Sequence, residues 1–286
     1  MLAHRQRIAD GFPHARIVYG GVYPTYAAEE SLRACPAIDV VVRGEGEQTV
    51  LDLVAAWEQG LPLAQVAGIT WRDGDFVRAS PNRPALRDVD AYRPGWELVE
   101  WGGYTLFGMG RAAGMQFSRG CPLTCTYCGQ WMFWKKWRHR SADNVVSELR
   151  KLVHDYGVRI VWFADENFGA DRDAVRELLQ KIIVANLGLS LNINLTASSV
   201  VRDADLLPLY KEAGVDYVVM GIESLEDNVV EAVRKNIPYA ISKEAVRLLR
   251  QHHIISLTNI IYGLEEEGVG TLAQVAQDGR VGFRHS

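Results

Sequence analysis

The chain has 286 residues, which at about 150 residues per domain suggests roughly two domains. Hydrophobic residues make up 48% of it and charged residues 23%, and this composition excludes an intrinsically disordered chain. The 31 basic and 35 acidic residues give a net charge of −4, so we expect no nucleic-acid partner. The sequence has no apolar run long enough to span a membrane and no signal-peptide core, and we expect a cytoplasmic protein.

The first 79 residues have the pattern of a small α/β unit. Apolar residues from Val50 to Trp57 recur at helical spacing and predict a helix. Asp73-Gly74 predicts a hairpin turn between two further strands, because glycine tolerates a positive φ. A stretch punctuated by prolines follows and predicts a linker. The strand-like runs of this unit are 17–19, 38–42, 68–72 and 75–79.

From residue 110 onward, strand-like and helical segments alternate. The apolar positions between Asp171 and Asn186, for example, lie on one helical face. The alternation predicts an α/β fold with a parallel sheet and helices outside it, either open or closed into a barrel. The strand-like runs are 115–118, 159–163, 189–195, 216–220 and 254–261.

Four of these strands end in chemically reactive residues. In parallel sheets, functional residues collect at the carboxyl ends of the strands. We therefore expect these four strand ends to lie together at one edge of the sheet, where a single site can form. The first strand runs into three cysteines, the second into Asp165-Glu166-Asn167, the fourth into Glu223, and the fifth into Glu265-Glu266-Glu267.

Three of the four cysteines lie within eight residues, whereas Cys35 stands alone. Cys121, Cys125 and Cys128 form a C-x3-C-x2-C pattern. Clustered thiols in a cytosolic chain indicate metal or redox chemistry more than disulfides. Three thiolates on one loop can hold three irons of a [4Fe–4S] cluster and leave the fourth iron open to a substrate or cofactor. A structural zinc site is the alternative, but it needs a fourth ligand, and the nearest histidine is His139.

The cysteine motif, with Tyr127 before its last cysteine, resembles that of the radical S-adenosylmethionine (SAM) enzymes. In that family the open iron binds the amino and carboxylate groups of SAM, and one electron from the reduced cluster cleaves SAM to a 5′-deoxyadenosyl radical. The resemblance covers residues 110–267 and implies a partial (β/α) barrel.

The resemblance also implies SAM contacts at the other strand ends. Solvated surface carboxylates are the alternative for Glu223 and for the run of three glutamates. The last motif departs from the family's G-x-I-x-G-x-x-E at Asn259, which stands where its first glycine should be. The implied contacts are Asp165 and Glu166 for the amino group, Glu223 for the ribose, and Ile261, Gly263 and Glu266 for the adenine, and Tyr127 is also expected to position SAM.

Two glycine-rich segments resemble the last part of a cobalamin-binding, Rossmann-like domain. Glycines allow the backbone to approach a nucleotide tail closely, and plain turn glycines are the alternative. The D-x-H-x-x-G motif that supplies a cobalt ligand is absent from this sequence. The segments contain Gly20, Gly21 and Thr25, and Gly44, Glu45 and Gly46.

The pattern indicates a fragment, because such a domain needs more βα repeats and the barrel needs a sixth strand. We expect four parts: a partial cobalamin-binding Rossmann-like domain at 1–79, a linker at 80–109, an incomplete radical SAM barrel at 110–267, and an unassigned tail at 268–286.

An aromatic and basic segment, 129–140, follows the cysteines. Such a segment can stack RNA bases and bind phosphate, or it can stack on a flat macrocycle and pair with its carboxylates. It can also simply be a helix with buried tryptophans and a solvated basic face. The run 116–140 also resembles the anaerobic magnesium-protoporphyrin IX monomethyl ester cyclases. That resemblance implies an oxygen-independent oxidative cyclisation in (bacterio)chlorophyll synthesis, assisted by cobalamin, with a low-potential electron donor and a porphyrin substrate. The candidate substrate contacts are Arg138, His139 and Arg140.

Two other functions remain open at this point. One is a cobalamin-dependent radical SAM methyltransferase or a tRNA methylthiotransferase, although the latter usually carries a second cluster that Cys35 alone cannot hold. The other is a non-catalytic module, either zinc-stabilised or an inactive fragment. Iron and zinc contents distinguish the non-catalytic module from the radical SAM enzymes.

Overall fold

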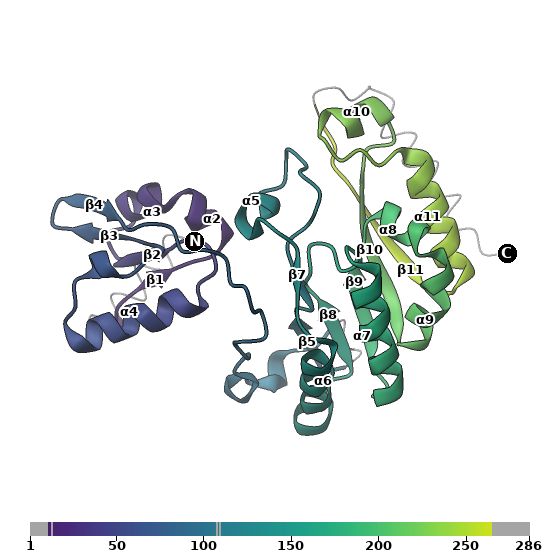
Figure 1. Cartoon of the computed structure of the whole chain (residues 1–286), viewed down its shortest axis with the longest axis horizontal. Coiled ribbons are helices and arrows are strands. Elements are labelled where there is room, and N and C mark those ends of the chain that lie inside the picture. Colours follow the sequence, from purple (N-terminus) through teal and green to yellow (C-terminus); the bar gives the residue numbers. More distant parts are fainter. Residues whose placement is uncertain (1–10, 13, 107, 109, 265–286) are drawn as a thin grey trace. The chain divides into compact units, whose positions relative to one another are not determined.

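The structure is a computed structural model that describes residues 11–264 except 13, 107 and 109. The chain divides into two compact units (Figure 1). The first unit consists of the chain up to Asp88 together with Met132–Lys135, and the second unit consists of the rest. Each unit has its own sheet and its own hydrophobic core.

The first unit is a four-stranded sheet with helices. Its strands lie in the order β1-β2-β3-β4, with β1 parallel to β2 and the other pairs antiparallel. Leu53 of the predicted helix is fully buried against Val40 and Ile69, and Trp57 packs on the same core, whereas Val50 and Val54 are exposed, so only part of the predicted apolar stripe faces the sheet. The elements are β1 (Val18–Tyr19), α2 (Val22–Tyr26), α3 (Ala28–Ala34), β2 (Val40–Val42), α4 (Glu47–Gln59), a 3-10 turn (Leu63–Gln65), β3 (Ile69–Asp73) and β4 (Phe76–Ala79).

The hairpin between β3 and β4 is confirmed, but its turn lies one residue further on than predicted. Asp73 is still in the ladder, where it pairs with Phe76, so Gly74 and Asp75 form the two-residue loop. Gly74 has a φ of 59°, the left-handed conformation that such a turn requires. Asp73 stays in the strand, where its carboxylate accepts a hydrogen bond from Arg78 Nε at 3.2 Å.

The stretch 80–109, expected to be a linker, is anchored at both of its ends. In the first unit, the backbone N–H of Leu86 donates to the Glu45 carboxylate at 2.8 Å. In the second unit, the indole N–H of Trp96 donates to the Glu148 carboxylate at 2.7 Å. The stretch also contains two 3-10 turns, Trp96–Leu98 and Trp101–Gly103.

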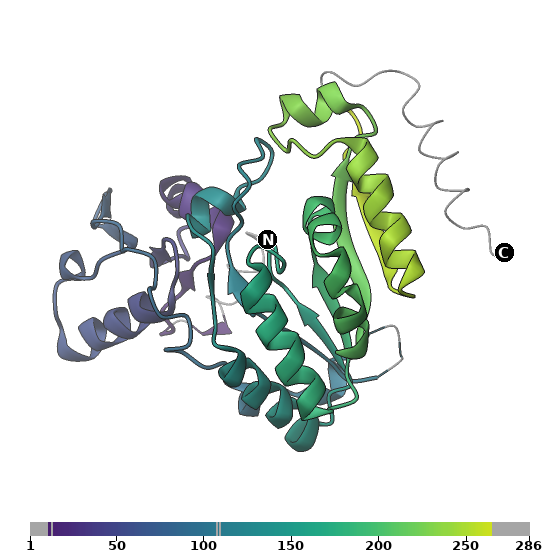
Figure 2. The same ribbon diagram turned by 45° about the vertical axis from the view of Figure 1, so that its right-hand side comes forward.

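The second unit is an α/β structure with a five-stranded sheet, as predicted. The strand order is β11-β10-β9-β8-β5, and every pair is parallel. The helices lie outside this sheet, with α6 against α7, α7 against α9, and α8 against α11 (Figures 1 and 2). The strands are β5 (Ala112–Met115), β8 (Ile160–Phe163), β9 (Ser190–Asn194), β10 (Val215–Glu223) and β11 (Ile255–Ile260). The helices are α6 (Ala142–Tyr156), α7 (Arg172–Ala185), α8 (Ala197–Arg202), α9 (Leu207–Glu212), α10 (Asp227–Ala232) and α11 (Tyr239–Gln251), with a 3-10 turn at Ala204–Leu206.

Local capping signals fix the ends of the longer helices. The Asp171 carboxylate accepts hydrogen bonds from the N–H groups of Asp173 and Ala174, both at 3.0 Å, and so begins α7 where the sequence predicted. Asn186 ends α7 in the left-handed conformation, with a φ of 47°. The inner faces of these helices and of the sheet make one continuous core, which includes Leu149 and Leu178.

The first strand of the second unit was predicted at 115–118 and is found earlier, at Ala112–Met115. Beyond Met115 the backbone leaves the sheet, and a second short strand, β6 (Ser118–Arg119), pairs antiparallel with β7 (Arg138–His139). The buried Asp165 carboxylate accepts hydrogen bonds from the N–H groups of Phe117 and Ser118 and so holds the segment between the two strands. The cysteine loop therefore begins from a small two-stranded ribbon and not from the sheet itself.

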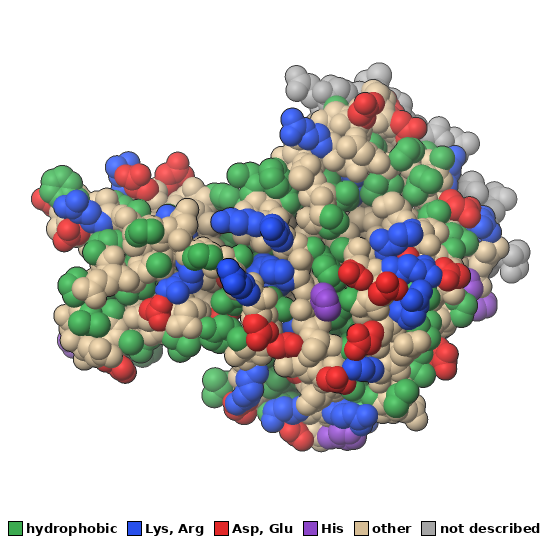
Figure 3. Space-filling view, in the orientation of Figure 1, with side chains coloured by type: hydrophobic (Ala, Val, Ile, Leu, Met, Phe, Trp, Pro, Cys, Tyr) green, Lys and Arg blue, Asp and Glu red, His purple; other side chains and the backbone are tan. Residues whose placement is uncertain are grey.

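The surface carries charges of both signs. On the face shown in Figure 3, Lys and Arg side chains are interspersed with Asp and Glu side chains. Among the residues that the structure describes, no helix is long and apolar enough to cross a membrane.

Two left-handed glycines give a matched test of this packing. Gly214 has a φ of 94°, and an added Cβ would lie 2.3 Å from the Leu189 carbonyl oxygen, whereas Gly188 has a φ of 62° and open space around it. We predict that Gly188→Ala lowers the free energy of unfolding by about 1–2 kcal/mol, the cost of the left-handed backbone. Gly214→Ala should lower it by roughly 1–3 kcal/mol more, because the backbone must also move. Urea denaturation measures both, and equal losses would contradict the packing described at Gly214.

Candidate functional site

The three clustered cysteines lie on a loop that leaves β6 at the carboxyl end of the sheet. Cys125 is buried, and Cys121 and Cys128 are half-buried. The loop is held by its backbone: the N–H of Thr126 donates to the Val233 carbonyl at 3.0 Å, and the N–H of Cys128 donates to the Cys125 carbonyl at 3.1 Å. The loop is therefore tied to the segment that follows β10.

The thiol chemistry of this loop fits metal ligation. Burial raises the pKa of the Cys121 thiol and also that of the Cys125 thiol, so each needs a nearby positive charge to become a thiolate. Within the described part of the chain, no three His, Cys, Asp or Glu side chains lie close enough to share one metal ion. A cluster spreads its ligands over several irons.

Asn167 adds an orphaned polar atom beside this loop. Its Oδ1 is buried and has no hydrogen-bond partner among the described residues, while its side chain also hydrogen-bonds to Cys121. Buried acceptors are normally satisfied, so a lone one indicates a site for a ligand or a water molecule. Asn167 follows a predicted strand, but an asparagine by itself has no distinctive signal, so the sequence does not assign it a role.

Asp165 follows β8 and is completely buried. Its Oδ2 accepts from the N–H of Phe117 at 3.1 Å, and its Oδ1 accepts from both the N–H and the hydroxyl of Ser118 at 2.5 Å. Both oxygens are therefore used within the chain. The expectation that Asp165 binds the amino group of SAM is not supported by this geometry, because its carboxylate instead holds the segment that leads into the cysteine loop.

Glu166 lies closer to the loop. It is half-buried, and its Oε2 accepts a hydrogen bond from the N–H of Gly120, the residue before Cys121, at 3.3 Å. The carboxylate is therefore next to the first cysteine. The proposed contact of Glu166 with SAM stays a prediction.

Glu223 ends β10 in a left-handed conformation, with a φ of 68°, and is buried. Its Oε1 accepts a hydrogen bond from Lys235 Nζ at 2.6 Å. The phenol of Tyr127 is within hydrogen-bonding reach of both Glu223 and Cys125. Burial raises the pKa of Tyr127, so this phenol is a hydrogen-bond donor. Lys235 was not among the predicted site residues, since its position is defined only by the folded chain.

The fifth strand end reaches the same place. The N–H of Ile261 donates to the Glu223 carbonyl at 2.9 Å, and Gly263 has a left-handed φ of 89°. Glu266 lies outside the described residues. The structure thus brings together the cysteine loop and the ends of β8, β10 and β11, as the alternation of strands and helices predicted.

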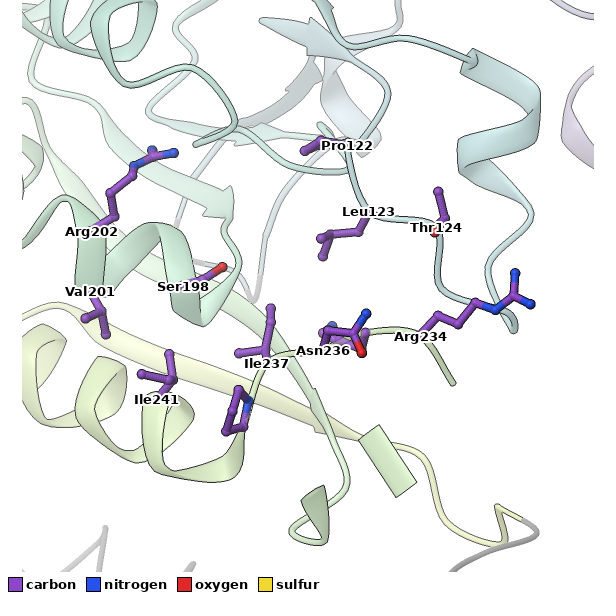
Figure 4. A pocket seen from close by; sticks show the side chains of 12 residues that line it. Pro122, Leu123, Thr124, Ser198, Val201, Arg202, Arg234, Asn236, Ile237 and Ile241 are labelled. Carbon is purple, nitrogen blue, oxygen red and sulfur yellow. The ribbon is translucent and has the colours of Figure 1, made fainter. Parts of the chain in front are cut away.

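A pocket of about 600 Å³ opens beside the cysteine loop (Figure 4). Pro122, Leu123 and Thr124 of the loop form one side of it. The pocket has three basic lining residues and no acidic one. The other lining residues are Ser198, Val201 and Arg202 of α8, Arg234, Lys235, Asn236, Ile237 and Pro238 of the segment before α11, and Ile241 of α11.

The two glycine-rich segments of the first unit lie side by side. Thr25 joins them: its hydroxyl donates to the Gly21 carbonyl at 2.7 Å and accepts from the N–H of Gly44 at 2.9 Å. Gly21 and Gly44 have positive φ values of 111° and 74°, and no atom of the chain lies within 4 Å of where a Cβ would be. The space over both glycines is therefore open, which fits a ligand cradle. Gly20 and Gly46 flank them, whereas the Glu45 carboxylate is occupied by the N–H of Leu86.

The three candidate substrate contacts have different surroundings. His139 is exposed and Arg138 is half-buried, on the ribbon strand β7. Arg140, in contrast, is only 8% exposed, and its guanidinium contacts both Glu148, in the middle of α6, and Asp90. The expectation that Arg140 binds substrate is therefore corrected: its charge is used inside the fold.

One family and several relatives match the chain. The family model of the Radical SAM superfamily matches residues 115–278. An anaerobic magnesium-protoporphyrin IX monomethyl ester cyclase of Synechocystis sp. is 40% identical over 91% of this chain and 52% of the relative. An uncharacterised methyltransferase of Pyrococcus horikoshii is 32% identical over 88% of this chain and 54% of the relative. The chain spans about half the length of these curated relatives.

A solved structure shares the fold. TsrM of Kitasatospora setae is a radical S-adenosylmethionine methyltransferase whose structure holds cobalamin and a [4Fe–4S] cluster. It superposes with a TM-score of 0.79 at 18% identity, covering 98% of this chain and 56% of that one. At this identity the likeness concerns the fold alone.

The geometry at Asp165 predicts a pH-dependent stability. Burial raises the pKa of Asp165 to about 7, against the opposing hydrogen bonds from Ser118 and Phe117. A carboxyl whose pKa is raised on folding stabilises the fold at low pH, and this contribution is lost as the pH rises towards 7. Between pH 5 and pH 8 the loss should be roughly 2 kcal/mol.

Asp165→Asn removes this titration while leaving one N–H of the loop without its acceptor. We expect the variant to be less stable than the wild type by about 1–3 kcal/mol at pH 5, and the gap to shrink at pH 8. Urea denaturation at the two pH values measures both quantities. A gap that is the same at both values would contradict the raised pKa.

Proposed function

The chain belongs to the radical SAM superfamily, and from this premise we propose that it binds a [4Fe–4S] cluster through Cys121, Cys125 and Cys128 and generates a radical from SAM. The observation that carries the proposal is the convergence of the cysteine loop with the ends of β8, β10 and β11. Three thiol ligands leave one iron without a protein ligand, which is where SAM binds. When bound, the reduced cluster supplies the electron that cleaves SAM.

The residues around the loop would position SAM. Glu166 is next to Gly120 and offers a carboxylate for the SAM amino group. Tyr127 and Glu223 offer a phenol and a carboxylate beside Cys125, suited to the hydroxyl groups of a ribose. Ile261 and Gly263 follow β11, and the N–H of Ile261 donates to the Glu223 carbonyl. We assign these two residues to the adenine. Glu266 remains a proposed adenine contact on the basis of its motif alone.

We further propose that residues 1–79 are the C-terminal part of a cobalamin-binding domain. The two open glycine segments that Thr25 joins support this assignment. They follow β1 and β2, which are parallel neighbours, and ligands of such folds bind at the carboxyl ends of parallel strands. The remaining parts would be a linker at 80–109, an incomplete barrel at 110–267, and a tail at 268–286 that we leave unassigned.

For the reaction, we propose the oxygen-independent oxidative cyclisation of magnesium-protoporphyrin IX monomethyl ester. The identity of 40% with the Synechocystis cyclase, extending over both units, favours it. Arg138 and His139 are the candidate contacts for the macrocycle and its carboxylates, and a low-potential donor would supply electrons. A cobalamin-dependent methyltransferase is the second candidate, favoured by the relative from Pyrococcus horikoshii. A methyltransferase yields a methylated product and S-adenosylhomocysteine, and the cyclase yields neither.

The cluster assignment makes a direct prediction for iron content. Anaerobically reconstituted wild type should hold about four irons per chain and no stoichiometric zinc. Cys125→Ser should lose most of the iron and the cluster absorbance, because one thiolate ligand is missing. Cys35→Ser is the matched control: Cys35 is also buried but lies in the first unit, so this variant should keep its iron.

Iron and zinc analysis with visible absorption spectroscopy checks these outcomes. A Cys125→Ser protein with normal cluster absorbance would contradict the assignment of Cys125 as a cluster ligand. One zinc per wild-type chain, with little iron, would instead support the metal-binding module.

A further inference from the structure

The second unit contains a buried ion pair next to the cysteine loop, and the proposed function assigns a role to its glutamate, Glu223, but none to its lysine, Lys235. Lys235 is 7% exposed and Glu223 is 6% exposed, and their charged atoms are 2.6 Å apart. A buried ammonium is unfavourable unless something compensates it, and replacing such a pair by apolar residues is often neutral or stabilising. The pair is therefore weak evidence for stability and raises the question of what the charge does.

The backbone is arranged to hold the pair in place. An added Cβ at Gly221 would lie 1.9 Å from Glu223 Oε1 and 2.6 Å from Lys235 Nζ, so only glycine leaves room for the two charged groups. Glu223, Arg234 and Asn236 all have positive φ values, between 54° and 68°. Left-handed non-glycine residues cost free energy and gather at functional sites.

The pair is coupled to the cysteine loop by two contacts. The backbone N–H of Thr126 donates to the carbonyl of Val233, two residues before Lys235. Tyr127 reaches both Glu223 and Cys125 with its phenol. The charges of Lys235 and Glu223 both act on the Cys125 thiol, in opposite directions. The Lys235 charge therefore acts on a thiol that would bind the cluster.

We propose that Lys235 is a positioning residue whose charge raises the reduction potential of the cluster, and that the charge of Glu223 opposes this effect. This inference rests on the proposed function. Reduction adds one electron, and hence one negative charge, to a cluster already bound by three thiolates. A buried ammonium stabilises that added charge and a buried carboxylate opposes it, because both act through a medium of low dielectric constant.

The charge effect predicts opposite shifts for the two single variants. Lys235→Met removes the positive charge and should make the reduction equilibrium at least about tenfold less favourable, which for one electron is about 59 mV towards lower potential. Glu223→Gln removes the negative charge and should shift the potential the other way. Lys235→Arg keeps the charge and should stay near the wild type. A purely structural role of the pair would not give opposite signs.

The measurement is a redox titration followed by electron paramagnetic resonance at pH 8 without SAM, on reconstituted full chain with its iron content determined. Lys211→Met is the matched control, because Lys211 forms an exposed pair with Asp216 on α9 and β10, 2.7 Å apart, away from the cysteine loop. Its potential should equal that of the wild type. If Lys235→Met does not fold, Glu223→Gln and Lys235→Arg still decide the sign.

Opposite shifts with an unmoved control support the proposal. Shifts of the same sign in the two variants overturn it. A Glu223→Gln potential within about 28 mV of the wild type, which is about threefold in the reduction equilibrium constant, also overturns it. Both results leave the cluster assignment intact. A wild type that holds no cluster overturns the proposed function and this inference together, so the two failures are distinguishable.

Discussion

The hydrogen bonds of the buried Asp165 carboxylate are the interaction on which the site depends. This side chain accepts hydrogen bonds from the N–H groups of Phe117 and Ser118, the residues just beyond the end of β5 at Met115. The chain then turns into a short ribbon, and the cysteine loop starts from that ribbon. Asp165 therefore fixes the segment from which the cysteine loop starts.

Arg140 holds the same segment from the other side. Its guanidinium donates to the Gln116 carbonyl at 3.1 Å, and its backbone N–H donates to the Phe117 carbonyl at 2.8 Å. Two buried charged side chains, one following β8 and the other directly following β7, therefore fix three consecutive residues. A loop that must present three ligands at a defined spacing needs such support, because a displacement of about 1 Å is enough to weaken a functional site.

The sequence predicts those features that depend on residue type and spacing alone. The alternation of strands and helices predicts the parallel sheet, and the cysteine spacing predicts the ligand loop, because both follow from local periodicity. It does not predict the roles of Asp165, Arg140 and Lys235. A buried carboxylate needs hydrogen-bond donors, but most donors of Asp165 are backbone N–H groups. Every residue except proline has such a group, so the sequence does not show which ones Asp165 will bind. The hairpin turn shifts by one residue for a similar reason, since Asp73 finds a partner in Arg78.

The central claim is that this loop holds a cluster with one iron open to SAM. Electron paramagnetic resonance of the reconstituted, dithionite-reduced chain, recorded with and without SAM, tests it most directly. The account predicts a [4Fe–4S]⁺ signal whose shape changes when SAM is added, because the cofactor binds the open iron. A cluster signal that is indifferent to SAM, or no cluster signal, would contradict it.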